Sequence, residues 1–386
     1  MAGNRRILWV SPIRFGETIH QVGEIGTAGA LRDRGWEIDF LHADSNSDGK
    51  LLPGLGFGSF EAKKSRFPLI GDLSFTISTI RRLNRILDNA SYDVIMAEWA
   101  CSVGVAHVLK RRRRLGKSTP PWLFEDRSPP AHRTMIGKLH WLHYDIAWRK
   151  AAKNADLVQV LVPGLERFLR ERFKDLPEMI HCPSGVDLDR FQPKESDLGG
   201  QVRIVYHGTL EEGRGLRRIV DLGIRMEGEG MDFRILVFGV GKLAPYFEEM
   251  ASRTSWLEFA GEVSYEEVPE LLSNNDFGIL PLPNRLVWNV GSPLKVMEFA
   301  SSGLCTLTTD VDGTIPFSGQ DWIDIAPSND PVDSWLEYLK KSLDNRNAFP
   351  SRRTSARRFA EQNMTWDAAV ADLDVELTRL CDLRSP

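Results

Sequence analysis

The stretch NVGSPLKVMEFASSGLCTLTTD, residues 289–310, predicts a loop, a helix and a buried strand in that order. The free N–H groups at such a helix start suit a diphosphate. Lys295 adds a positive charge there, and Glu298, one turn further on, can accept hydrogen bonds from both hydroxyls of a ribose. The alternative is an amphipathic helix with Glu298 in water, but the spacing favours a ligand site. The helix start comprises Gly291, Ser292, Pro293 and Leu294.

A second candidate, HGTLEEGRGL at residues 207–216, runs from a strand end through a glycine-containing turn into a helix. Gly208, Gly213 and Gly215 let the backbone come close to a ligand. Arg214 lies near the helix start and can pair with a phosphate. Taken alone, the segment is also compatible with an ordinary turn carrying a solvated arginine, because no GxGxxG or P-loop consensus is present.

Around these segments, apolar runs alternate with helix-length segments, which predicts an α/β protein with mostly parallel sheets. The expected strands are RRILWV (5–10), WEIDFLHA (36–43), DVIMAE (93–98), PWLFED (121–126), DLVQVLV (156–162), RIVYHG (203–208), FRILVFG (233–239), WLEFAG (256–261), DFGILPL (276–282) and CTLTTD (305–310). Residues 43–68 are polar and glycine-rich and are expected to be a long surface excursion. Three helical segments close the chain.

The alternation of strands and helices occurs once in each half of the chain. We therefore expect two doubly wound, Rossmann-like domains facing each other across a cleft. The predicted domains are residues 1–193 and 202–364, and a C-terminal helix over 365–386 is expected to return toward the first domain. Ligands of such sheets bind at the carboxyl ends of the strands. This predicts a cleft suited to a phosphorylated ligand.

The composition of the 386 residues is that of a soluble globular chain, with 42% hydrophobic and 26% charged residues. Residues 1–190 carry a net charge of +7 and the remainder −11, so the two halves are expected to have different partners. Four widely separated cysteines indicate reduced thiols. No apolar run reaches the roughly 18 residues of a membrane span, and we predict a cytoplasmic protein.

Taken together, the motifs resemble those of the family 4 retaining glycosyltransferases of the GT-B fold (glycosyl transferases group 1). SGVDLDRFQP (184–193) is similar to the motif NGVDxxRFxP at the end of the first domain, and residues 208–215 to GRLxxxKG. FAGEVSYEEVPELLSNNDFGILP (259–281) and SPLKVMEFASSGL (292–304) follow in the family's order. The matches cover most of the second half and are weaker in the first.

The resemblance implies a hexosyltransferase that uses a nucleotide-diphosphate sugar as donor and no cofactor. Arg214 and Lys295 would neutralise the diphosphate, and Glu298 would hold the ribose. Asp126 or Glu125, which end a strand of the first domain, would contact the donor sugar or the acceptor. The further donor contacts implied are Gly16, Gly208, Thr209, Val263, Gly291, Ser292, Pro293 and Leu294.

Among the departures from the family pattern, two concern contacts to the donor. Thr209 stands where the family has an arginine, and Val290 stands eight residues before Glu298, where the family has an acidic residue. Both departures remove polar or charged contacts to the donor.

A metal is not expected. Asp–x–Asp pairs occur at 187/189, 310/312 and 372/374, in unrelated contexts that indicate chance. His140 and His143 share a helix, but a third ligand is not evident.

The first half contains a basic run at residues 110–117. On the helix expected over 136–148, Trp141, Tyr144 and Trp148 form an aromatic stripe opposite the aliphatic one. The aromatic stripe either packs under a neighbouring loop or, with the basic residues, contacts the inner face of a membrane.

The expected partners are a nucleotide sugar and a glycan, lipid-linked or small-molecule acceptor, in cell-surface polysaccharide or glycoconjugate biosynthesis. Two other enzyme classes share the architecture, an epimerase of nucleotide sugars and a phosphorylase; a non-catalytic basic binding protein is the third alternative. Nucleic acid is not expected, because no DNA- or RNA-binding motif is present.

Overall fold

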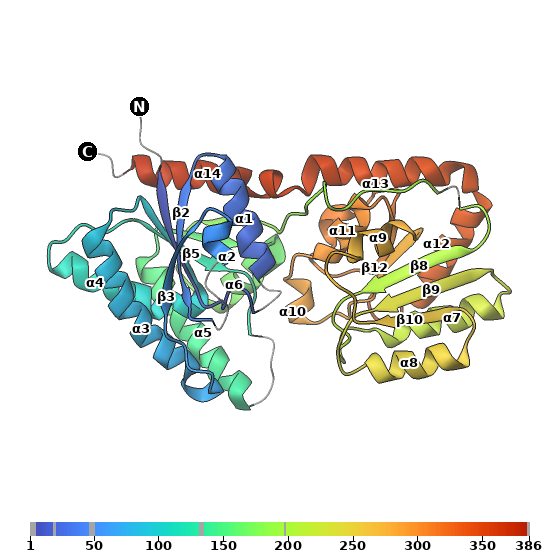
Figure 1. Ribbon diagram of the computed structural model, residues 1–386, viewed down its shortest axis with the longest axis horizontal. Helices are drawn as coiled ribbons and strands as arrows, with labels where there is room; N and C mark the ends of the chain where they lie inside the picture. The colour runs from blue at the N-terminus through green and yellow to red at the C-terminus, as the bar shows by residue number, and fades with distance from the viewer. Residues whose placement is uncertain (1–4, 18–20, 46–50, 131–134, 197, 384–386) are drawn as a thin grey trace. The chain divides into compact units, whose positions relative to one another are not determined.

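A computed structural model describes residues 5–17, 21–45, 51–130, 135–196 and 198–383 (Figure 1). The chain divides into two compact units. Unit 1 comprises residues 1–184 and 369–386, and unit 2 comprises residues 185–368. The domain boundaries that the sequence suggested, at residues 193 to 202 and 364 to 365, stay predictions.

Unit 1 contains a parallel sheet of seven strands in the order β3-β2-β1-β4-β5-β6-β7. The strands are β1 (Arg6–Ser11), β2 (Glu37–Ala43), β3 (Gly58–Ala62), β4 (Val94–Glu98), β5 (Trp122–Asp126), β6 (Leu157–Val160) and β7 (Met179–His181). The chain moves outward from β1 to β3 and then returns to β4. The β1–β4 junction is therefore the topological switch point, where ligands of doubly wound sheets bind.

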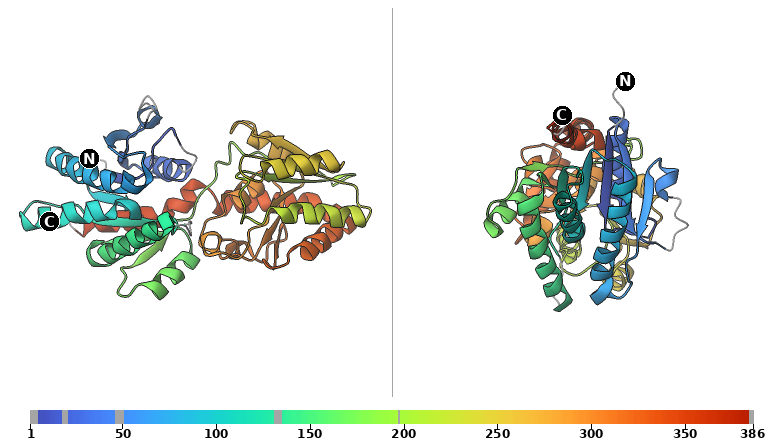
Figure 2. Two further views of the ribbon diagram at one scale, coloured as in Figure 1. Left: turned by 90° about the horizontal axis from the view of Figure 1, so that it is seen from below. Right: turned by 90° about the vertical axis from the view of Figure 1, so that its left-hand side faces the viewer.

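The helices of unit 1 are α1 (Gln21–Asp33), α2 (Leu51–Gly54), α3 (Pro68–Asn89), α4 (Ser102–Arg114), α5 (Met135–Asn154) and α6 (Pro163–Arg172). The C-terminal helix α14 (Trp366–Asp382) ends beside the first strands (Figure 2). Its Asp374 accepts a hydrogen bond of 2.7 Å from the indole of Trp36, at the start of β2, and lies 3.2 Å from Arg34.

Unit 2 contains a parallel sheet of six strands in the order β10-β9-β8-β11-β12-β13. The strands are β8 (Val202–His207), β9 (Phe233–Phe238), β10 (Leu257–Gly261), β11 (Phe277–Leu280), β12 (Cys305–Thr309) and β13 (Ile323–Ala326). The helices are α7 (Arg217–Gly228), α8 (Ala244–Arg253), α9 (Val268–Ser273), α10 (Leu286–Asn289), α11 (Leu294–Ser301), α12 (Val332–Asp344) and α13 (Phe349–Asn363). The strands are lined by buried Val, Ile, Leu and Phe, as expected of a sheet covered on both faces.

The α/β class and the ten strands expected from sequence are confirmed. The prediction of a surface excursion over residues 43–68 is wrong, because the segment contains α2 and the edge strand β3. The strand β3 was not predicted because an edge strand is half exposed and needs little apolar patterning. Its residues Phe60 and Glu61 are exposed. Residues 46–50 lie outside the described residues.

The proposed membrane role of the aromatic stripe is also corrected. Tyr144 and Trp148 of α5 are fully buried, and Trp141 packs edge-on against Tyr144. The aromatic face of α5 is therefore its core face. The outward face carries Leu139 and Leu142.

Candidate functional site

The carboxyl end of β8 carries the first part of the site. Gly208 follows the strand with φ of +111°, a conformation that L side chains rarely adopt. A Cβ at this position would lie 2.7 Å from Cε and 2.8 Å from Nζ of Lys295. The glycine therefore lets the lysine of α11 lie directly over the backbone that leaves β8. Burial lowers the pKa of Lys295, with Glu298 acting in the opposite direction.

Glu298 lies one turn after Lys295 and points to the same strand end. Its Oε2 lies 3.0 Å from Nε2 of His207, the last residue of β8. Burial acts to raise the pKa of Glu298, but the charges of His207, Lys295 and Arg190 outweigh burial and lower it. The side chain is therefore a carboxylate, which is the form that accepts hydrogen bonds from hydroxyl groups.

Arg214 is held by a side chain that sequence reasoning missed. Its guanidinium lies over the indole of Trp288 in α10, 4.4 Å from the ring centroid. The indole N–H in turn donates a 3.0 Å hydrogen bond to the carbonyl of Gly213. The positive charge of Arg214 contributes to the lowered pKa of Lys295, so the two cations repel each other electrostatically. Two clustered cations with one carboxylate suit a ligand with two phosphates and a diol.

Arg190 was also missed, because its segment was interpreted as a structural connection. Phe191 and Gly185 do have that role, since Phe191 is buried and a Cβ on Gly185 would meet the backbone of Trp366 at 2.5 Å. The guanidinium of Arg190, however, stacks on the ring of Tyr265 at 3.3 Å and donates to its carbonyl oxygen. Arg190, which precedes β8 in the chain, is also close enough for its charge to lower the pKa of Glu298.

The remaining predicted residues of unit 2 border this strand edge or the loop after β10. Thr209 accepts a hydrogen bond at its carbonyl from the hydroxyl of Tyr206, at 3.1 Å. Val290 is buried, and Val263 packs against the core. Gly291, Ser292 and Pro293 precede α11 and Leu294 begins it, and all four residues are partly exposed.

In unit 1, Glu125 and Asp126 end β5 and are both fully buried. Glu125 accepts hydrogen bonds from the indole of Trp9 at 3.0 Å and from Arg127 at 2.9 Å. Asp126 Oδ2 accepts from Tyr144 at 2.5 Å and from the indole of Trp148 at 2.8 Å. Asp126 thus fastens the aromatic face of α5 to the end of β5.

Two further carboxyls, also missed from sequence, join Glu125 at the switch point. Glu98 ends β4 directly opposite Glu125 in register, and Glu24 of α1 accepts a 2.9 Å hydrogen bond from Ser11 at the end of β1. Burial, followed by the charge of Glu125, raises the pKa of Glu98 to about 8. The same two causes raise the pKa of Glu24.

The pKa of Asp126 is raised to about 6, chiefly by burial. The charge of Arg127 lowers the pKa of Glu24, Glu98 and Glu125, and Lys64 also lowers that of Glu98. A pKa of about 8 keeps Glu98 mostly protonated at neutral pH, whereas a pKa of about 6 leaves Asp126 mostly ionised. Gly16 lies in the turn after β1 with φ of +87°, and its N–H donates to Gln21 at 2.6 Å.

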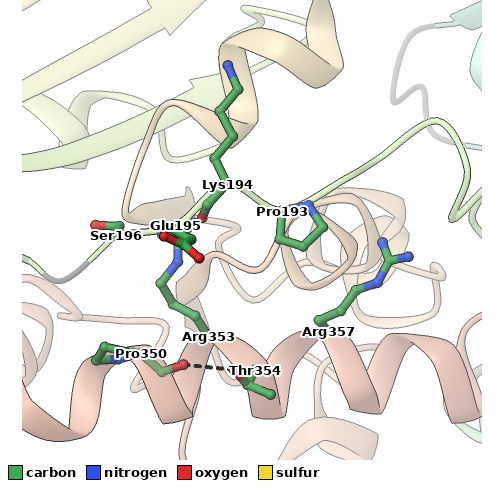
Figure 3. A pocket seen from close by; sticks show the side chains of 8 residues that line it. All are labelled: Pro193, Lys194, Glu195, Ser196, Pro350, Arg353, Thr354 and Arg357. Carbon is green, nitrogen blue, oxygen red and sulfur yellow. Dashed lines mark hydrogen bonds between the residues drawn. The ribbon is translucent and has the colours of Figure 1, made fainter.

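A cavity of about 690 Å³ elsewhere in unit 2 is less suited to a ligand. Its guanidinium groups belong to Arg353 and Arg357 of α13 (Figure 3). Arg353 donates to the carbonyls of Asn275 and Lys194, each at 3.0 Å, and Arg357 donates to that of Phe191 at 2.6 Å. Both side chains hold the entering chain in place.

Within the described ranges, no group of three or more His, Cys, Asp and Glu side chains is arranged to hold a metal ion. Among the same residues, no helix combines the length and apolar character needed to cross a membrane. Metal independence stays a prediction.

Two doubly wound domains, the second with cations and a carboxylate at the carboxyl edge of its sheet, define the GT-B class. Residues 201–345 match the sequence model of the family described as glycosyl transferases group 1. The match covers the second domain and agrees with the resemblance at the level of group 1. The assignment to family 4 stays a prediction. None of the curated proteins matches this chain in sequence.

Solved structures confirm the GT-B fold over both domains. Sucrose-phosphate synthase from Thermosynechococcus elongatus superimposes with a TM-score of 0.74 at 14% identity, over 99% of this chain and 100% of that chain. HepE of Anabaena, solved in complex with UDP, gives 0.72 at 13% identity over 97% and 100% of the two chains. WaaG, a glycosyltransferase involved in lipopolysaccharide biosynthesis, gives 0.66 at 15% identity over 96% and 99%.

Proposed function

We propose that this protein is a retaining glycosyltransferase that moves a hexosyl group from a nucleotide-diphosphate sugar to a hydroxyl of an acceptor. The observation that carries the proposal is the convergence of Lys295 and Glu298 on the end of β8, where Gly208 leaves room for the lysine. The group 1 match over residues 201–345 supports it. So does the likeness in fold to HepE, which was solved with UDP-glucose.

In the proposed donor site, positive charges bind the diphosphate and hydrogen bonds bind the ribose. Arg214 and Lys295 bind the diphosphate and stabilise the negative charge that grows on it as the bond to the sugar breaks. Glu298 accepts hydrogen bonds from the ribose diol. Backbone N–H groups at the start of α11, within residues 291–294, contact the rest of the nucleotide sugar. Gly208, Thr209 and Val263 also line it.

In the proposed reaction, the bond between the anomeric carbon and the diphosphate oxygen breaks, and a bond to the acceptor oxygen forms on the same face. The proton of the acceptor hydroxyl leaves with the diphosphate or to solvent. Glu125 and Asp126 stay predicted contacts to the sugar or acceptor, and Gly16 a predicted contact of the first loop. Glu98 is a further carboxyl of that edge, and part of its surface is accessible.

A thermal-shift screen with UDP-, GDP-, ADP- and TDP-sugars tests the donor class, because a ligand that binds the folded state raises its melting temperature. Proton NMR of the product then reports whether the anomeric configuration is retained. A shift with one nucleotide sugar, followed by transfer with retention, supports the proposal. Epimerised donor as the product, or no shift with any nucleotide sugar, contradicts it. The transfer assay compares three acceptors: a glycan, a lipid-linked sugar and a small molecule.

A further inference from the structure

Three carboxyl groups meet at the switch point of unit 1, and we call them the switch-point acids: Glu24, Glu98 and Glu125. Glu98 and Glu125 end neighbouring strands opposite each other in register, and Glu24 lies in the first turn of α1. Burial and then the charge of Glu125 raise the pKa of both Glu24 and Glu98, so the three groups are close enough to repel each other. Residues 1–190 carry a net charge of +7, so this concentration of acids runs against the charge of the rest of the unit.

Two buried oxygen atoms at this edge have no hydrogen-bond donor within the described ranges. Oε1 of Glu24 accepts a hydrogen bond of 2.9 Å from Ser11, whereas Oε2 is buried and finds no partner among the residues that the structure describes. The same holds for the side-chain oxygen of Gln159, which lies opposite Glu125 on β6. Nearly all buried polar atoms of native proteins are hydrogen-bonded. The edge therefore indicates a ligand that supplies donors, and the half-buried Glu98 gives access to it.

Arg127 compensates one of the switch-point acids. Its guanidinium donates a hydrogen bond of 2.9 Å to Glu125. Gly23, in the first turn of α1, makes room for it, because a Cβ at this glycine would lie 2.6 Å from a guanidinium nitrogen. The position of the guanidinium beside Glu125 is therefore fixed by packing as well as by charge. One guanidinium balances one carboxylate, and two switch-point acids remain.

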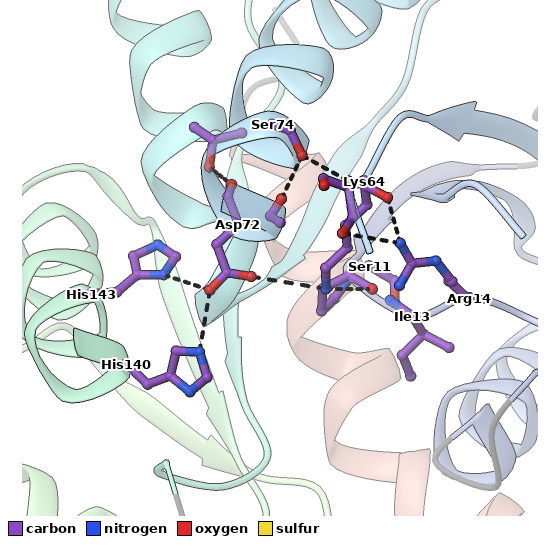
Figure 4. Close-up of polar contacts among 12 residues, drawn as sticks. Ser11, Ile13, Arg14, Lys64, Asp72, Ser74, His140 and His143 are labelled. Carbon is purple, nitrogen blue, oxygen red and sulfur yellow. Dashed lines mark hydrogen bonds and ion pairs between the residues drawn. The ribbon is translucent and has the colours of Figure 1, made fainter. Parts of the chain in front are cut away.

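Lys64 also acts on the switch-point acids, but it shares its charge with Asp72 (Figure 4). Its Nζ donates a hydrogen bond of 3.2 Å to the carbonyl of Pro12 and lies 4.0 Å from Oδ1 of Asp72. Oδ2 of Asp72 lies 3.7 Å from Nε2 of His140 and 3.8 Å from Nδ1 of His143. The lysine is thus only partly available to the switch-point acids, and the site can take up further positive charge.

We propose that the acceptor of this glycosyltransferase is a sugar or cyclitol with a positively charged amino group, which binds among the switch-point acids. An ammonium group carries three N–H donors and a unit charge, so it supplies the missing donors beside Glu24 and Glu98 and neutralises an ionised carboxylate. A hydroxyl of the same molecule then receives the transferred sugar. An acceptor with a phosphate or carboxylate fits less well, because like charges repel each other. This inference rests on the proposed function, since it defines the acceptor of that reaction, but its test measures binding alone.

Binding of such an acceptor releases a proton. Burial, followed by the charge of Glu125, raises the pKa of Glu98 to about 8. A bound ammonium favours the ionised carboxylate and therefore lowers this pKa again. The affinity for an amine is expected to rise between about pH 6 and about pH 8, as Glu98 loses its proton. The titratable and charged groups that interact electrostatically with Glu98 are Glu24, Lys64, Cys101, Glu125, Asp126 and Arg127.

The test compares amino sugars with a neutral sugar of the same shape, in the absence of a nucleotide sugar. The probes are D-glucosamine, 6-amino-6-deoxy-D-glucose, D-glucose and D-glucose 6-phosphate, each titrated against the full chain by ligand-observed NMR. At least one of the two amino sugars is expected to bind about tenfold or more tightly than glucose, and the phosphate no more tightly than glucose. Calorimetry in phosphate and in Tris, two buffers of different ionisation enthalpy, should show proton release with the amino sugar and none with glucose.

Glu98→Gln removes the charge of the side chain but keeps its shape. This variant is expected to lower the affinity for the amino sugar about tenfold or more, to leave that for glucose unchanged and to diminish the proton release. The matched control is Glu171→Gln, which changes an exposed glutamate of α6 in the same unit and should bind like the unchanged protein. Melting temperatures show that both variants are folded, as expected for positions that are not fully buried.

Equal binding of the amino sugars and glucose, preferred binding of glucose 6-phosphate, or equal loss in Glu171→Gln overturns the proposal. So does unchanged binding of the amino sugar by a folded Glu98→Gln. The thermal-shift screen with nucleotide sugars distinguishes this failure from failure of the proposed function, because it measures binding of the donor. A chain that binds a nucleotide sugar but no amine contradicts only the acceptor class, whereas one that binds an amine but no nucleotide sugar contradicts glycosyl transfer.

Discussion

His207 at the end of β8 and Glu298 in α11 lie 3.0 Å apart, although 90 residues separate them in the chain. The contact fixes the carboxylate at the strand edge and, with Lys295 and Arg190, keeps its pKa low. A sheet edge that holds one carboxylate beside two arginines and a lysine can bind a ligand that is anionic at one end and rich in hydroxyls at the other. The predictions below separate these contributions.

Glu298→Ala is expected to weaken binding of the nucleotide sugar by about 1.5–3 kcal/mol, the value of hydrogen bonds to a charged group. Titration calorimetry with the donor found in the screen measures the loss. Glu248→Ala, an exposed glutamate of α8, is the control and should bind like the unchanged protein. Unchanged affinity of a folded Glu298→Ala would remove Glu298 from the site.

Lys295→Met and Arg214→Ala are each expected to lower kcat by about 10²–10³, the usual effect of removing one group that stabilises transition-state charge. Adding Thr209→Arg to Lys295→Met should restore part of kcat, because a cation from residue 209 starts next to Gly208, over which the lysine lies. Lys242→Ala, an exposed lysine, serves as control. Wild-type turnover in the variant that lacks both Lys295 and Arg214 would refute the diphosphate assignment.

Asp126→Ala is expected to lower the free energy of unfolding by about 2–5 kcal/mol, since it leaves Tyr144 and Trp148 with buried, unpaired donors. Denaturant titration measures the change. Tyr144→Phe removes one of these hydrogen bonds together with its donor, so its cost should be smaller, about 1 kcal/mol. Equal stability of Asp126→Ala and the unchanged protein would show that the carboxylate does not fasten α5.

The raised pKa of Glu98 predicts that stability falls as pH rises. A carboxyl that titrates near pH 8 when folded and near its ordinary 4.5 when unfolded keeps its proton longer in the folded state. Its stabilising contribution is therefore complete below about pH 4.5 and lost as the pH passes about 8, with a slope of at most about 1.4 kcal/mol per pH unit. The charged neighbours that set this pKa are Glu125, Arg127, Asp126 and Lys64.

Glu98→Gln removes this titration, so its curve of unfolding free energy against pH should be flatter than that of the unchanged protein between pH 5 and about 8. Urea titrations at several pH values give both curves. Parallel curves would mean that Glu98 titrates normally in the folded protein.

Activity is expected to survive EDTA, because the diphosphate charge is met by Arg214 and Lys295. Transfer is measured before and after dialysis against the chelator. A loss of activity that magnesium or manganese restores would contradict this expectation and direct attention to the Asp–x–Asp pairs, such as Asp310 and Asp312.

The sequence predicted ten of the thirteen strands of the two domains in their correct order, and missed β3, β7 and β13. Buried parallel strands are continuous apolar runs, and this signal is local. The relation of Lys295 to Glu298 was also predictable, since a helix places residues three apart on one side. β3 was not predictable, because an edge strand with exposed Phe60 and Glu61 lacks that pattern.

Only the tertiary structure showed how the predicted site residues meet and which further residues join them. The order of the parallel strands brings the end of β8 to Lys295 and Glu298, places Glu98 opposite Glu125, and lets Arg190 reach Tyr265. Helical periodicity likewise showed two apolar stripes on α5 but not which one is buried. Tyr144 and Trp148 became the core face because their polar atoms find Asp126, a partner that no local pattern specifies. Local spacing fixes what lies on one element, whereas contacts between distant elements depend on how the chain crosses the sheet.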